Sequence, residues 1–232
     1  MKVQMNMDDS ALLAALQLAD SFFPSGMVNL SHGLETFLSL APDTDVRRLL
    51  EDYLRYKVAP LELLAYLHAY RAAEAADLER LHEVDRALTA SLLPQELRHA
   101  SARSGRAMLD SLRPSEDDAL FRAFADGVDQ RRSQGNGPVC LAVVCVGWQV
   151  PQRAGGIVLL YSFMVSFVSA ALRLGSLGHR QAQAILRDLR PQLSCLVDMV
   201  WQRELDELGG FAPLADIRAM QHACLPVRLF SS

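Results

Sequence analysis

The side chains in this sequence that could bind a metal are few and stand far apart. His32 and Glu35 are three residues apart and would share one face of a helix. His222 and Cys224 are two apart near the C-terminus, where an imidazole and a thiol could bind a soft or borderline metal. Each pair offers only two ligands. We therefore favour a helix-start histidine with a capping glutamate in the first case and an incidental pair in the second, and assign no metal ligands.

Motifs of catalytic sites are absent from the sequence. His82-Glu83 begins like the metalloprotease motif H-E-x-x-H, but Arg86 occupies the place of the second histidine. The only lysines are Lys2 and Lys57, and neither follows a glycine, which excludes the phosphate-binding loop G-x-x-x-x-G-K-[ST]. The nucleophile motif G-x-S-x-G is also missing. We predict no catalytic residues, no cofactor of the chain's own and no enzymatic activity.

Length and composition indicate one globular domain that spans residues 1–232. The chain has 232 residues, of which 50% are hydrophobic and 22% charged, a balance too apolar for disorder. The net charge of −4 gives no reason to expect nonspecific binding to nucleic acid. No C-x-x-C pair occurs among the four cysteines, so we expect neither a disulfide framework nor a structural zinc site.

The sequence also predicts a cytoplasmic protein that does not enter a membrane. Residues 1–9 are acidic and polar and do not resemble a signal peptide. The longest apolar run, residues 157–172, contains three serines and is short for a membrane span. We expect it to form a buried core helix. Ser162, Ser166 and Ala170 give this helix one narrow face of small side chains, which favours close approach of another helix inside the fold over a dimer contact.

Helical periodicity runs through the chain, and no segment alternates apolar and polar residues over the length of a strand. Asp43 or Thr44 can cap the third helix, Pro60 should kink that helix or begin a new one, and Gly155-Gly156 should precede the apolar helix. The fold class is therefore all-α, a single-domain bundle of about ten helices. The other expected helices cover residues 8–19, 30–40, 77–92, 94–112, 116–131, a segment from Pro138, segments on both sides of Pro191, and 214–222.

Residues 16–36 interrupt this pattern. Aromatic and aliphatic side chains continue through the segment, but Pro24 fixes its own backbone angle and Gly26 can adopt conformations that other residues avoid. The segment is either a shaped, buried loop or an ordinary helix-loop-helix corner with a hydrophobic staple. The residues alone leave both interpretations open.

Three blocks of this sequence resemble the UreF family of urease accessory proteins. The first contains Leu16-Gln-Leu-Ala-Asp-Ser21, Phe23-Pro-Ser-Gly26 and Ser31-His-Gly-Leu-Glu35. The second is Val168-Ser-Ala-Ala-Leu-Arg-Leu-Gly-Ser-Leu-Gly178. The third runs from Phe211-Ala-Pro-Leu-Ala-Asp216 through His222 to Arg228-Leu-Phe-Ser-Ser232. The blocks follow the family's order and extend over nearly the whole chain.

The resemblance implies an all-α homodimer that acts as an adaptor and not as an enzyme. Members of the family join UreD (also called UreH) and the GTPase UreG on apo-urease, where nickel is inserted, and they are implicated in controlling the GTPase. The assembled complex handles the nickel, so no resident cofactor is expected in this chain. The residues that match the family's motifs, and that we expect to bind partners, are Pro24, Gly26, His32, Gly33, Glu35, Asp216, Met220, His222, Arg228 and Phe230.

The ends of the chain carry further expectations. We expect a flexible acidic N-terminus over about residues 1–8, and a tail over about residues 223–232 that is loose in the free protein. The tail would become ordered against UreD/UreH, with Arg228 meeting a partner carboxylate or carbonyl. The sequence departs from the family's pattern at Val28, Ala223, Pro226 and Val227.

The alternative to the adaptor is a helical metal-binding protein or enzyme. It would use the residues of the two pairs named at the start, His32, Glu35, His222 and Cys224.

Overall fold

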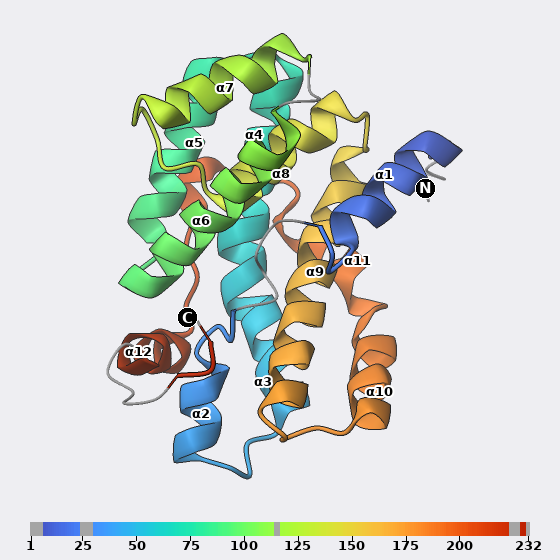
Figure 1. Ribbon diagram of the computed structural model, residues 1–232, viewed down its shortest axis with the longest axis vertical. Coiled ribbons are helices and arrows are strands. Elements are labelled where there is room, and N and C mark those ends of the chain that lie inside the picture. The colour runs from blue at the N-terminus through green and yellow to red at the C-terminus, as the bar shows by residue number, and fades with distance from the viewer. Residues whose placement is uncertain (1–6, 24–29, 114–116, 223–227, 231–232) are drawn as a thin grey trace.

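The computed structural model describes residues 7–23, 30–113, 117–222 and 228–230 (Figure 1). No strand occurs in these ranges, which confirms the prediction of an all-α fold. The helices are α1 (Asp9–Ala19), α2 (Leu34–Leu40), α3 (Val46–Tyr53), the π-helix η2 (Leu54–Leu63), α4 (Leu64–Glu74), α5 (Leu78–Ser91), α6 (Gln95–Leu112), α7 (Ala119–Asp129), α8 (Gly137–Gly147), α9 (Gln152–Arg173), α10 (His179–Leu189), α11 (Gln192–Val200), the short 3-10 helix η3 (Leu205–Glu207) and α12 (Pro213–His222).

Several helices begin at an aspartate whose side chain caps the first turn. Asp8 accepts a hydrogen bond from the amide of Ala11 at the start of α1, and Asp118 accepts one from Phe121 at the start of α7. The third helix is capped by Asp45, which accepts from Arg48, and not by Asp43 or Thr44 as expected. Residues 1–6 of the N-terminus that we expected to be flexible lie outside the described residues.

Pro60 does not begin a new helix. It lies inside η2, and α3, η2 and α4 follow one another without a break. A proline in an α-helix clashes with the carbonyl four residues earlier, and the wider turn of a π-helix relieves that clash. That carbonyl belongs to Tyr56, and it accepts a hydrogen bond from Phe211 N at 2.8 Å, just before α12. The Tyr56 carbonyl therefore helps to hold the chain that leads into α12.

The apolar helix α9 forms the centre of the core, as expected. It packs against α1, α2, α3, α8, α10, α11 and η2. Among the described residues, α9 is the one helix long and apolar enough to cross a membrane, and 67% of its most apolar window is buried inside the fold. Ser166 and Ala170 are buried there. Their burial supports the interpretation that the face of small residues packs within the fold.

The prediction that Gly155-Gly156 precedes α9 is wrong, because both glycines lie within the helix. A β-carbon on Gly155 would come within 2.0 Å of the Tyr66 hydroxyl oxygen, and one on Gly156 within 3.0 Å of a Leu63 methyl carbon. The two glycines therefore let α9 approach η2 and α4 closely. They mark a packing contact and not a helix boundary.

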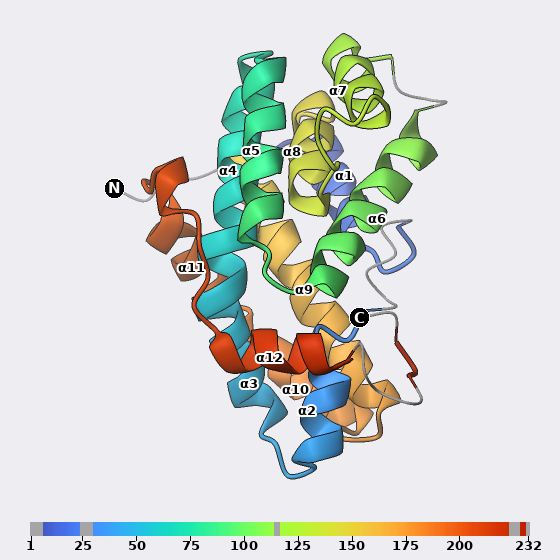
Figure 2. The same ribbon diagram turned by 90° about the vertical axis from the view of Figure 1, so that its left-hand side faces the viewer.

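The second helix is shorter than predicted. It begins at Leu34 and not at Leu30, because His32 and Gly33 have left-handed backbone angles, with φ of 53° and 81°. The helix that follows, α2, lies at one end of the bundle, where α12 crosses it (Figure 2). α12 also contacts α6, so this end joins segments from the beginning, middle and end of the chain.

Candidate functional site

The candidate site is built around His222, the last residue of α12, whose side chain is fully buried. Its Nδ1 lies 2.8 Å from Glu96 Oε2 on α6, and its Nε2 lies 2.9 Å from Glu35 Oε2 on α2. This buried cluster joins three helices.

The tail is attached to the same two glutamates through their other oxygens. Arg228 Nη1 donates to Glu96 Oε1 at 2.9 Å, and the amide of Leu229 donates to Glu35 Oε1 at 2.9 Å. Phe230 is buried, and the Arg173 guanidinium lies 4.2 Å from the centre of its ring. The expectation of a loose tail is therefore wrong for residues 228–230. Arg228 meets a carboxylate of its own chain.

Gly33 allows α12 to lie close to the start of α2. A β-carbon at Gly33 would approach the backbone nitrogen of Ala219 to 3.1 Å, and the positive φ of 81° also favours glycine there. Asp216, in the first turn of α12, forms a largely buried ion pair with Lys57 of η2. These two contacts, together with the His222 cluster, fix the inner face of α12.

His32 does not join Glu35, although the sequence places them three residues apart. The His32 ring lies against Phe163, with 4.5 Å between ring centres. Burial, and then the positive charge of Lys57, lower its pKa to about 3, so the ring is neutral under physiological conditions. Glu35 does not cap a helix start, because its oxygens face His222 and Leu229.

The outer face of α12 is apolar and exposed. Leu214, Ile217 and Met220 follow one another at three-residue spacing, with 53%, 49% and 48% of their surfaces exposed. Ala215, Ala219 and His222 occupy the opposite, buried face. Phe211 and Leu229 next to the helix are exposed as well. We call the residues Phe211, Leu214, Ile217, Met220 and Leu229 the α12 face. An apolar patch of this kind is typical of a protein interaction site.

The sequence motifs thus identified the site residues on α2, on α12 and in the tail, but not the one on α6. The structure brings together Glu35, His222 and Arg228, and sets Gly33 and Asp216 against α12. It places Met220 on the outer surface. Pro24, Gly26 and Cys224, like the departures Val28, Ala223, Pro226 and Val227, lie outside the described residues.

Glu96 was missed. It lies in the first turn of α6, where an acidic residue is ordinary, and no local spacing connects it with residue 222.

The geometry offers little to a resident metal. In the described ranges there is no group of three or more His, Cys, Asp or Glu side chains that could hold one. Both nitrogens of His222 already face carboxylates, and the tail occupies the second oxygen of each glutamate. The cluster is a hydrogen-bonded joint between helices, and its arrangement does not favour the metal-binding or enzymatic alternative.

Comparison with known proteins gives consistent results. The family model described as UreF matches residues 41–190. Urease accessory protein UreF from Trichodesmium erythraeum (strain IMS101) is 32% identical over 235 residues, which cover 98% of this chain and 99% of the relative. The protein of the same name from Bacillus sp. (strain TB-90) is 30% identical over 224 residues, covering 95% and 99%. That from Actinobacillus pleuropneumoniae serotype 5b (strain L20) is 31% identical, covering 94% and 98%.

Proposed function

The chain belongs to the UreF family of urease accessory proteins, and on this premise we propose that it is a non-enzymatic adaptor for urease maturation. It joins UreD/UreH and the GTPase UreG on apo-urease, in the cytoplasm, for insertion of nickel into the urease active site. Nickel is the cargo of the assembled complex. Contacts with UreG also modulate its GTP hydrolysis.

The observation that carries the proposal is the α12 face. Three apolar side chains stand exposed on one side of α12, while the other side is fixed by an ion pair and a buried histidine cluster. A fixed helix loses little conformational freedom when a partner covers it, so more of the apolar contact contributes to affinity. We assign this face to UreD/UreH, with Met220 among its contacts and Arg228 next to Leu229 in the chain.

The other residues that match the family's motifs position α12 through contacts with its buried side. Glu35, Asp216 and His222 hold α12 in place, while Gly33 lets it come close. Phe230 is buried and anchors the end of the tail. Their contribution to partner binding is indirect, through the position of α12 and of Arg228.

A second apolar surface suits the homodimer. Leu12, Leu13 and Leu16 on α1 are 44%, 65% and 58% exposed, and Phe22, just beyond the helix, is 94% exposed. We propose that this surface pairs with its copy in a second chain. Sedimentation of Leu13→Asp as a dimer at micromolar concentration would place the contact elsewhere.

The test of the adaptor is co-expression of the tagged chain with UreD/UreH, UreG and apo-urease. We expect all of these to co-purify with the chain. In cells that lack the chain, we expect urease to be produced without nickel. Fully nickel-loaded urease in those cells, or recovery of the chain without any of its partners, would overturn the proposal.

A further inference from the structure

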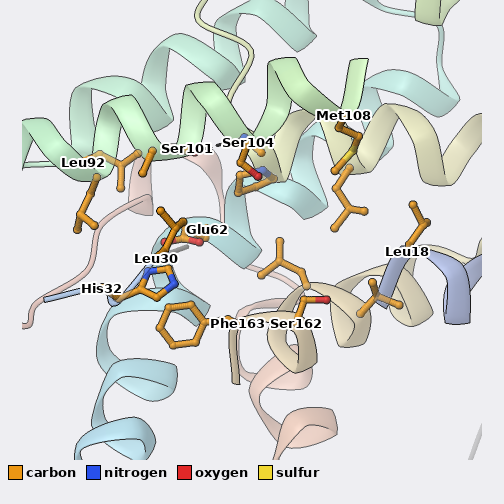
Figure 3. A pocket seen from close by; sticks show the side chains of 17 residues that line it. Leu18, Leu30, His32, Glu62, Leu92, Ser101, Ser104, Met108, Ser162 and Phe163 are labelled. Atoms are coloured by element: carbon orange, nitrogen blue, oxygen red, sulfur yellow. Dashed lines mark hydrogen bonds between the residues drawn. The ribbon is translucent and has the colours of Figure 1, made fainter. Parts of the chain in front are cut away.

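A partly open cavity of about 80 Å³ lies between α1, α6, α8 and α9 (Figure 3). It exceeds the roughly 10–15 Å³ that one water needs and is smaller than the roughly 150 Å³ of a cavity that admits benzene. In the view of Figure 3, His32 and Glu62 lie toward one end and Leu18 and Met108 toward the other. Most of the lining is apolar, including Leu30, Leu97, Leu141, Val158 and Leu159.

Two polar atoms in the lining lack a hydrogen-bond partner among the described residues. They are Nε2 of His32 and Oγ of Ser162, and both atoms are buried. Buried polar atoms in native proteins nearly always have a partner. The two atoms therefore mark positions where an occupant of the cavity would form hydrogen bonds.

Contacts of both its backbone and its ring fix the position of His32. Its backbone has the left-handed φ of 53°, which is uncommon for a residue other than glycine and recurs at ligand sites. The Tyr53 hydroxyl donates to its carbonyl at 2.8 Å, and the Phe163 ring packs against its imidazole at a tilt of 51°. The imidazole is thus fixed with Nε2 unpaired in the described part of the chain.

The cavity offers no fixed charge to a ligand in mildly acidic solution. The lowered pKa of His32, about 3, leaves its imidazole uncharged. Burial raises the pKa of Glu62 to about 7, although the positive charge of Lys57 opposes this, so the carboxyl keeps its proton in mildly acidic solution. Lys57 itself is paired with Asp216. A charged ligand would lose its water without gaining a counter-charge.

We propose that this cavity is a binding site for a small uncharged molecule with one hydroxyl or amide group on a short apolar body. The polar group forms a hydrogen bond with Ser162 Oγ, and the body, of about three to five non-hydrogen atoms, contacts the leucine and methionine side chains. The site includes His32, which comes immediately before Gly33 and the start of α2. It does not depend on the adaptor role, and either proposal can fail alone.

The test uses three probes with the same apolar body: 1-propanol, propionate and propylammonium. Each is titrated at about pH 6, where Glu62 and His32 are both mostly uncharged, into the full-length, isotope-labelled chain and followed by NMR. We expect 1-propanol to saturate at millimolar concentration, about the affinity that so small a ligand allows, with shifts at Ser162, Met108 and Leu141. The two charged probes should bind at least about tenfold more weakly.

A matched pair of variants isolates the polar contact. Ser162→Ala should weaken 1-propanol binding about fivefold, since one hydrogen bond is lost, whereas Ser194→Ala, at an exposed serine, should leave it unchanged. The NMR spectrum reports directly whether each variant is folded. Equal binding of all three probes, no saturation by any, or no difference between the variants would overturn the proposal and leave the cavity as one that holds only water.

Discussion

Glu35 Oε2 lies 2.9 Å from His222 Nε2, although 187 positions separate the two residues in the chain. This contact joins the first of the sequence blocks that identify the family to the last one. Two segments far apart in the chain thus meet at one joint, to which the first contributes the Glu35 carboxylate and the last the His222 ring. The exposed α12 face depends on this joint for its position.

The first prediction concerns the buried cluster. His222→Leu keeps a similar volume but leaves Glu35 and Glu96 without their shared partner, so we expect a loss of about 2–4 kcal/mol in the free energy of unfolding. Gln221→Ala, at the exposed neighbour, should change it by less than about 0.5 kcal/mol. Urea denaturation measures both. Equal stability of the two variants would show that the cluster does not hold α12.

The second prediction concerns the tail. Removing residues 228–232 takes away the buried Phe230 and the hydrogen bond from Leu229, and should cost about 2 kcal/mol of stability. Arg228→Ala alone should cost no more than about 1 kcal/mol, because its ion pair with Glu96 is partly exposed to water. Thermal unfolding compares them. A truncated chain as stable as the full one would mean that the tail is not anchored in solution.

The third prediction separates the two reasons for a glycine at position 33. Gly33→Ala adds backbone strain and a contact with Ala219, and should cost about 1–3 kcal/mol. Gly175→Ala adds only strain, because its φ is 74° and its surroundings are open, so it should cost less. Gly209→Ala adds neither. Chemical denaturation of the three should give this order of stability, and a harmless Gly33→Ala would argue against close packing of α12.

The fourth prediction concerns pH. The pKa of Glu62 is about 7 in the folded chain and 4.5 as its ordinary value, so the folded state binds more protons between these values. Stability from this group is therefore present below pH 4.5 and is lost as the pH rises toward 7. Glu62→Gln should abolish that loss. The free energy of unfolding of the variant minus that of the unchanged chain should therefore be larger at pH 7.5 than at pH 4.5, by on the order of 2–3 kcal/mol.

His32 has the opposite dependence. Its pKa is lowered from 6.5 to about 3, so its contribution to stability is lost as the pH falls through that interval. Glu62→Gln, the exposed control Glu74→Gln and the unchanged chain therefore need the same pH series. A difference between Glu62→Gln and the unchanged chain that does not vary with pH would contradict the assignment.

The regular helices could be predicted from the sequence because their signals are local. The expected ranges 77–92 and 94–112 correspond to Leu78–Ser91 and Gln95–Leu112. Where the prediction failed, a distant contact decided the outcome. Gly155 predicts a helix boundary, but it lies within α9. The residue is a glycine because Tyr66 from another helix occupies the space that a side chain would need. Pro60 also reads as a break, but the π-helix accommodates it.

The site was predictable only as far as the family's motifs extend. Glu35, His222 and Arg228 were singled out separately, and nothing in their spacing shows that they meet. Glu96 binds two of them and carries no signal of its own in the sequence. The prediction of a loose tail was wrong for residues 228–230, because the sequence does not show that Glu35 and Glu96 lie where the tail can bind them.

The central claim, that the α12 face binds UreD/UreH, is tested most directly by two methionines of similar exposure. Met220 on α12 and Met199 on α11 are 48% and 44% exposed. We compare the amount of UreD/UreH that co-purifies with Met220→Asp and with Met199→Asp from co-expressing cells. The account predicts at least about a tenfold loss for Met220→Asp and a change within about twofold for Met199→Asp. Undiminished recovery with a folded Met220→Asp chain, or equal losses for both variants, would contradict it.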